Sequence, residues 1–134
     1  GNARLYVLGT ISMSGQSQIT IANTGTLNMY LGGDASLGGN GVVNSTADAT
    51  RFGVWALPTC TQVSFGGNAE FTGTIYAPDS AFSAGGGGNT TYDVVGGVIA
   101  NTIRLNGHFN FHYDERLGNS GPQASLVVTG WDEI

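Results

Sequence analysis

The sequence predicts an all-β fold, specifically a right-handed parallel β-helix (β-solenoid) of about five to six short coils with a C-terminal cap. Three observations lead to this expectation. A pattern of two apolar residues, separated by one residue and followed by glycine, recurs along the chain. Glycine accounts for 23 of the 134 residues. Charged residues make up only 10% of the chain, against about 25% in a typical globular domain.

The repeated pattern predicts five short strands at similar intervals. Their sequences are ISMSG (11–15), ASLGG (35–39), VSFGG (63–67), FSAGG (82–86) and IRLNG (103–107), with starts 24, 28, 19 and 21 residues apart. Alternation places both apolar side chains on one face of a strand, and the glycine ends it at a corner. A second class of strands lies between these copies: ITI (19–21), LNMYL (27–31), FTGTIYA (71–77), VVGGVIA (94–100) and FNFHY (109–113).

Two or three short strands in each period of about 23 residues are typical of one coil of a solenoid. Stacked coils would share a narrow apolar interior, and the outward positions would form ladders of Thr, Ser and Asn. An antiparallel β-sandwich is the competing fold. Loops are expected at NSTADATR (44–51) and GGGGNTTYD (85–93).

We expect the two ends of the predicted solenoid to differ, with a cap on the C-terminal coil and an open N-terminal coil. After Leu117, GNSGPQ is expected to form a loop and SLVVTGW (125–131) a last strand, which together would cap the C-terminal coil. No polar cap precedes Leu5, so the first coil is expected to be open or covered by missing sequence or a neighbouring subunit. The chain begins at Gly1 without a Met, and we interpret residues 1–134 as one domain from the C-terminal part of a longer exported protein.

Composition argues against several classes of function. The net charge is −5 and the chain contains no Lys, so it lacks the basic surface that nucleic-acid binding requires. No apolar run is long enough to span a membrane. Cys60 is the single cysteine, which excludes an internal disulfide, and we expect it to be a small buried apolar residue.

Residues 71–117 resemble a domain of uncharacterised function at the C-terminus of PilX-like bacterial pilus assembly proteins and related surface proteins. The resemblance rests on GTIYAP (73–78), Tyr92-Asp93 after the glycine run, VVGGVIAN (94–101), LNGHF (105–109), HYDE (112–115) and the closing Trp131, with LPTCTQVSFGGN (57–68) before them. It implies a β-helical module that is exported behind an N-terminal prepilin-like segment. It implies no catalytic residues, because none is established for that family.

His112, Asp114 and Glu115 form the densest group of ionisable residues, with His108 and Asp93 as possible neighbours. On a strand, His112 and Asp114 would share one face, and a His/carboxylate set can orient a base or hold a divalent metal. The competing interpretation is a cap in which these groups bind backbone at the last coil and pair with Arg104 or Arg116. We assign no catalytic residue and no cofactor; His112, Asp114 and Glu115 are the candidates kept for a metal.

Two other kinds of site were considered. The repeat G-G-x-G-x-D, which binds calcium in some solenoids, fails in GGNGVV (38–43), GGDASL (32–37) and GGGGNT (85–90). For a glycan-cleaving enzyme, Glu70 with Asp79 or Asp93 would be the carboxylate pair. Exposed aromatic residues could stack on sugars, or else pack in the coils or under loops: Tyr30, Trp55, Tyr76 and Tyr92.

The sequence therefore predicts a non-enzymatic structural or adhesive module of a pilus-like or fibrous assembly at the bacterial cell surface. We expect it to associate with further copies through its open N-terminal end, with pilus components or surface glycans as other partners. The alternative is a glycan-binding or glycan-cleaving β-helix protein. A cleft that combines two carboxylates, or a His, with exposed aromatic residues would favour that alternative.

Overall fold

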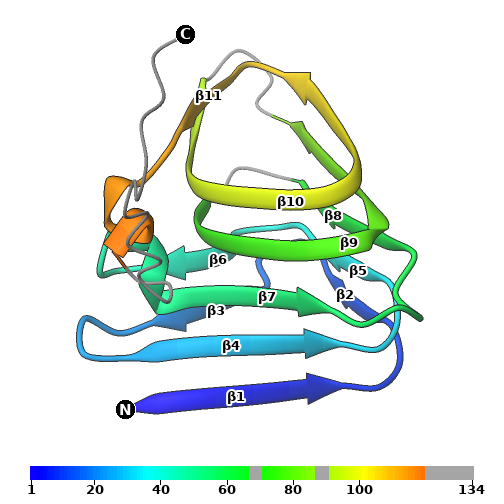
Figure 1. Cartoon of the computed structure of the whole chain (residues 1–134), viewed down its shortest axis with the longest axis horizontal. Coiled ribbons are helices and arrows are strands. Elements are labelled where there is room, and N and C mark those ends of the chain that lie inside the picture. The colour runs from blue at the N-terminus through cyan, green and yellow to red at the C-terminus, as the bar shows by residue number, and fades with distance from the viewer. Residues whose placement is uncertain (67–70, 87–90, 120–134) are drawn as a thin grey trace, which may run out of the picture.

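The computed structural model describes residues 1–66, 71–86 and 91–119 of the chain, which wind into a β-solenoid of about four turns (Figure 1). Among the described residues, no helix is long and apolar enough to cross a membrane. The elements are β1 (Asn2–Val7), β2 (Ile11–Met13), β3 (Gln18–Ile21), β4 (Thr26–Leu31), β5 (Ala35–Leu37), β6 (Gly41–Asn44), the short 3-10 helix η1 (Ala49–Arg51), β7 (Phe52–Ala56), β8 (Gln62–Phe65), β9 (Phe71–Gly86), β10 (Tyr92–Gly107), β11 (Phe109–His112) and the 3-10 helix η2 (Glu115–Asn119).

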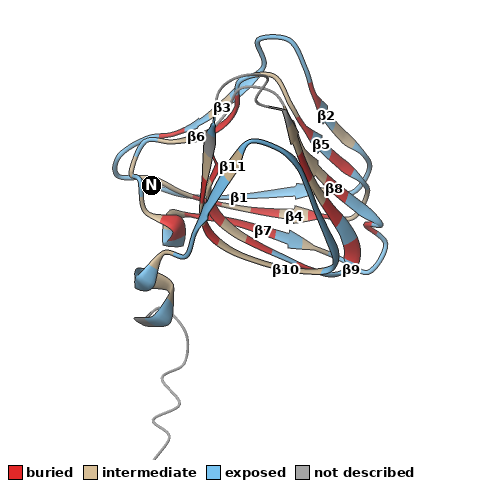
Figure 2. Cartoon of the chain, turned by 90° about the horizontal axis from the view of Figure 1, so that it is seen from above, coloured by how far each residue is buried: buried red, intermediate tan, exposed pale blue. Residues whose placement is uncertain are grey.

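All strand pairs among the described residues are parallel, which excludes the antiparallel sandwich. Seen from above, the coil has a three-sided outline with its buried residues inside (Figure 2). One side stacks β1, β4, β7, the first half of β9 and β10. A second side stacks β2, β5, β8 and the later halves of β9 and β10, while β3 and β6 pair on the third.

The glycine-terminated repeat is confirmed residue by residue. The five residues that begin its copies are consecutive partners across the second side of the solenoid: Ile11, Ala35, Val63, Phe82 and Ile103. The unequal spacings of these residues are therefore the lengths of successive coils. The coils differ in length because the corners between strands contain different numbers of residues, while the strands on the second side stay in register.

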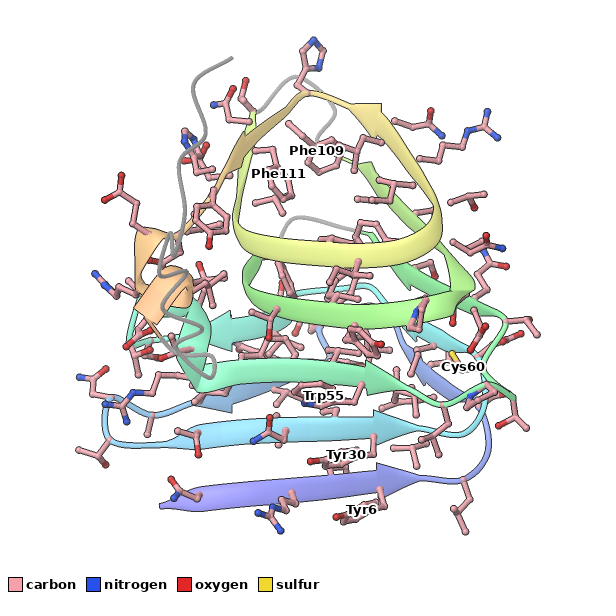
Figure 3. The ribbon with its side chains drawn as sticks, in the orientation of Figure 1. Tyr6, Tyr30, Trp55, Cys60, Phe109 and Phe111 are labelled. Carbon is pink, nitrogen blue, oxygen red and sulfur yellow. The ribbon has the colours of Figure 1, made fainter. Side chains whose placement is uncertain are left out.

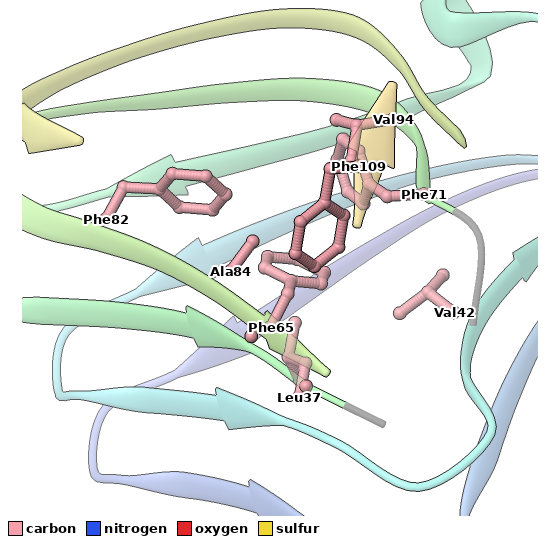
Figure 4. Close-up of a pocket in the computed structure, with 10 residues that line it drawn as sticks. Leu37, Val42, Phe65, Phe71, Phe82, Ala84, Val94 and Phe109 are labelled. Atoms are coloured by element: carbon pink, nitrogen blue, oxygen red, sulfur yellow. The ribbon is translucent and has the colours of Figure 1, made fainter. Parts of the chain in front are cut away.

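The interior consists of apolar rows that run through the stack. Leu31 is fully buried between its strand partners Val7 and Ala56. Towards the β11 end the filling becomes aromatic, and the ring of Phe65 lies 4.8 Å from that of Phe71 and 6.0 Å from that of Phe82. The cavity among these rings measures about 20 Å³ (Figure 4), room for about one water molecule. The interior is thus a packed core and not a ligand site.

Glycine is required where successive coils come closest. A Cβ on Gly33 would lie 2.6 Å from the carbonyl oxygen of Gly9 in the preceding coil. Gly96 has a φ of 138°, a conformation that essentially only glycine adopts. A Cβ on Gly96 would overlap the carbonyl oxygen of Gly73. These contacts explain part of the high glycine content, because at these positions the backbone of one coil approaches that of the next too closely to leave room for a side chain.

Three expectations about individual segments need correction or lie outside the description. The described part makes about four turns, not five to six, because the chain leaves the stack after β11 and forms η2 beside η1. The two predicted loops are partly regular: Asn44 ends β6, residues 49–51 form η1, Gly85 and Gly86 end β9, and Tyr92 and Asp93 begin β10. The predicted strand 125–131 and its role as a cap lie outside the described residues.

Candidate functional site

An aromatic ladder runs up the outer face of the first side of the solenoid. We use this term for Tyr6, Tyr30, Trp55 and Tyr76, which are strand partners in β1, β4, β7 and β9. The first three are labelled in Figure 3. Ring centroids are 4.7 Å apart for Tyr6 and Tyr30, 6.4 Å for Tyr30 and Trp55, and 5.7 Å for Trp55 and Tyr76. The first two pairs are nearly parallel, at 11° and 17°. The spacing of parallel strands, about 4.8 Å, thus brings like side chains into stacking distance.

The indole of Trp55 is held in place by its neighbours on the same face. Its Nε1 donates a hydrogen bond of 3.1 Å to the side-chain oxygen of Asn28. Gly53 lies between the two, and a Cβ there would be 2.7 Å from the Asn28 oxygen and 3.0 Å from the indole nitrogen. The small residue therefore permits the hydrogen bond, which fixes the orientation of the ring.

Stacking within the ladder bears on the glycan-binding alternative. A sugar packs on the flat face of an aromatic ring, but Tyr30 has an aromatic ring on each side, as does Trp55. The outer faces of Tyr6 and Tyr76, at the two ends of the ladder, have no aromatic neighbour among the described residues. The side chain of Tyr92, the fourth aromatic candidate, lies outside the described part. The ladder is consequently a poor platform for sugars along most of its length.

An open hollow of about 760 Å³ adjoins the upper end of the ladder and reaches the edge of β10. Its lining combines residues of the first side and of η1 with residues from β11 and the segment after it: Asn28, Thr50, Gly53, Trp55, Thr74, Ile75, Tyr76, Gly97, Val98, Ile99, Phe111, Tyr113 and Leu117. Among the described residues that line it, none is charged and none is a histidine. The described lining of the hollow thus combines aromatic residues with neutral polar and apolar ones, and the carboxylate pair or histidine sought for the glycan alternative is not among them.

The candidates for a metal are separated by the fold. The Nε2 atom of His112 lies 3.3 Å from Oδ1 of Asp93, and both side chains are about half exposed. Asp114 turns away, accepting hydrogen bonds from the backbone nitrogens of Ala49 at 3.0 Å and Arg116 at 3.1 Å. Glu115 is exposed at the start of η2. Among the described residues, no three His, Cys, Asp or Glu side chains are close enough to hold a metal ion.

The expectation that His112 and Asp114 share a strand face is wrong, because β11 ends at His112. Asp114 instead fastens the segment after β11 to η1, and the Arg116 guanidinium donates a 3.0 Å hydrogen bond to the carbonyl of Ala47. For Asp114 alone, these bonds agree with the alternative interpretation, in which the groups bind backbone and pair with Arg104 or Arg116; the Nε of Arg116 lies 4.0 Å from Asp114.

Two further carboxylates stabilise corners of the coil. One oxygen of Asp34 accepts hydrogen bonds from the backbone nitrogen and the hydroxyl of Thr61 and from the backbone nitrogen of Gln62, at 2.8, 2.9 and 3.0 Å. These bonds lower the pKa of Asp34, in that order of importance. The hydroxyl of Thr50 is the main cause of a lowered pKa at Asp48. A lowered pKa keeps a carboxylate ionised, the opposite of what a general acid needs.

The remaining candidate residues from the sequence are Cys60, Asp79 and Glu70. Cys60 is fully buried, as expected, and its backbone carbonyl accepts a 2.6 Å hydrogen bond from the buried hydroxyl of Ser80. Asp79 is exposed, and Glu70 lies outside the described residues, so the pairs of Glu70 with Asp79 and with Asp93 lie outside the description.

Sequence reasoning found three of the four ladder residues as separate aromatic side chains but missed Tyr6, the strand at β7, and the alignment of all four. A signal was present in the sequence. Each ladder residue is the centre of an apolar–aromatic–apolar triplet: LYV (5–7), MYL (29–31), VWA (54–56) and IYA (75–77). Listing these triplets at intervals of 21–25 residues would have predicted both β7 and the ladder.

Residues 1–120 match the profile of DUF7305, a domain of unknown function. The chain belongs to the DUF7305 family. Comparisons with curated proteins and with solved structures found no match. The match thus assigns the DUF7305 family but says nothing of pili, and the likeness to PilX-like proteins stays a prediction.

Proposed function

We propose that this DUF7305 domain is a non-enzymatic structural module of a pilus-like or fibrous assembly at the bacterial cell surface, and that it associates with a second copy through its N-terminal end. The observation that carries the proposal is the unpaired edge of the first coil. Among the described strands, β1 pairs only with β4, β2 only with β5 and β3 only with β6. Unpaired strand edges favour pairing with another chain.

The side chains at this end suit association in water. Tyr6 is 62% exposed and Leu8 86%, although both are large and apolar. Arg4 is the single charged side chain among residues 1–33. Covering this end would remove apolar surface from water with little cost for desolvating charge. The extracellular location is supported by the resemblance to pilus-associated surface proteins, and by a composition without Lys and with few charges.

A concentration series measured by light scattering tests the proposal. The average mass of the chain should rise with concentration above that of the 13.7 kDa monomer. Tyr6 lies on the edge strand β1 and Leu8 directly follows it. Tyr6→Lys and Leu8→Lys should therefore suppress the increase, because lysine at a strand edge opposes pairing. Leu57→Lys is the matched control, since Leu57 is an exposed leucine that follows β7 in the middle of the stack.

A monomer at every concentration would contradict self-association. An increase that all three variants share would show that association uses another surface. A segment that precedes Gly1 in a longer protein could also occupy the edge of β1, and this would appear as loss of association when that segment is included.

A further inference from the structure

The far end of the solenoid has an unpaired edge as well, beside the uncharged hollow. β11 pairs with β10 only at Tyr92–Val95. Beyond that point, Gly96–Ala100 of β10 pair with β9 on one side and with no described strand on the other. Ile99 is 58% exposed there, and Phe111 and Tyr113 of the hollow are also exposed. An apolar strand edge and an apolar hollow thus lie side by side at this end.

The strand register shows which residues would meet if the stack continued. Following partners from coil to coil, the aromatic ladder leads from Tyr6 to Ile99. The inward row beside it leads from Val7 through Leu31 and Ala77 to Ala100. On the second side, the row that starts at Ile11 ends at Ile103. Each of these rows therefore has a largely apolar residue in its first coil and another in its last coil.

We propose that β1 of one copy pairs in parallel with Gly96–Ala100 of β10 in the next, so that Tyr6 lies on Ile99 beside the hollow and Val7 lies on Ala100. The inference rests on the self-association proposed above and specifies its partner surface. Arg4 would then lie opposite Gly97. A Cβ built on Gly97 would have only the Leu117 side chain within 4 Å, at 3.4 Å, so the site has room for the long side chain of Arg4. The pairing uses different surfaces on the two copies, so it can repeat from copy to copy, and copies stacked along the axis of the solenoid would build a filament.

Cysteine cross-linking between two differently labelled batches of protein tests the register. One batch carries Val7→Cys and the other Ala100→Cys; both residues are half-buried ends of the row, and the changes are small enough to keep its contacts. In neighbouring parallel strands their Cα atoms would be about 4.8 Å apart, which a disulfide can bridge. Oxidation of the mixture with diamide should give a covalent dimer that neither batch gives alone. Cys60 should not interfere, because it is buried.

The matched control replaces Ala100→Cys by Val98→Cys, two residues out of register. The Cα separation would then be about 8 Å, beyond the reach of a disulfide, and the yield of dimer should fall several-fold. Circular dichroism of each variant establishes that the batches are folded before mixing.

Each alternative result has a distinct meaning. A dimer formed by Val7→Cys alone would show that two N-terminal ends meet, which overturns the head-to-tail register but keeps self-association. A rising mass without any cross-link would show that the copies associate in another way than through this register, and would also overturn this inference alone. Absence of both the cross-link and the mass increase would overturn the proposed function as well.

Discussion

Replacing Leu31 by alanine measures how much the stacked interior contributes to stability. Leu31 is fully buried between Val7 and Ala56. The change removes three buried carbon atoms, or about 2.4 kcal/mol at about 0.8 kcal/mol each, and leaves a cavity that adds to the loss. We expect the free energy of unfolding to fall by about 3–4 kcal/mol and the Tm to fall by roughly 10 °C.

Leu57→Ala is the control for this prediction. Leu57 is 44% exposed, so the same atoms leave a half-solvated site, and a loss of about 1 kcal/mol is expected. Urea unfolding followed by tryptophan fluorescence gives both values, and an unchanged m-value shows that the same amount of surface is exposed on unfolding. Equal losses for the two leucines, or a loss below about 1 kcal/mol for Leu31, would refute the packed interior.

Three further predictions follow from single contacts. Gly96→Ala should prevent stable folding or lower the Tm by more than Leu31→Ala does, because its Cβ would overlap the Gly73 carbonyl; an unchanged Tm would contradict the close approach of β9 and β10. Hydrogen bonds to Asp34 lower its pKa from 3.8, so the stability that they add is present above about pH 4 and is lost as the pH falls further. Asp34→Asn should therefore lower the Tm at pH 6, with a difference that narrows towards pH 3, whereas a constant difference would argue against the carboxylate. Cys60 should react with a thiol reagent only after unfolding, and rapid reaction of the folded chain would show that it is accessible.

The alternation of apolar and polar residues along the chain was enough to predict which side chains of most strands face the interior of the solenoid. In ISMSG and ASLGG the apolar positions point to the interior because successive residues of a strand face opposite ways. Met13, Ala35 and Leu37 are accordingly buried. This inference required no knowledge of the neighbouring coil. The sequence alone therefore determined the apolar face of these strands and the repeat that predicted the solenoid, whereas the parallel pairing that excluded the sandwich came from the structure.

The alignment between coils was decided only by the tertiary structure. Coil lengths vary because each corner has its own number of residues, so the partner of Tyr6 is set by the turn at Gly9 and by every residue up to Tyr30. That alignment creates the aromatic ladder. The tertiary structure also decided the partners of the ionisable groups. His112 and Asp114 are close in the sequence, but His112 contacts Asp93 whereas Asp114 binds the backbone of Ala49 in another part of the fold. Contacts between distant segments depend on where the backbone leaves the stack, and no local pattern records that position.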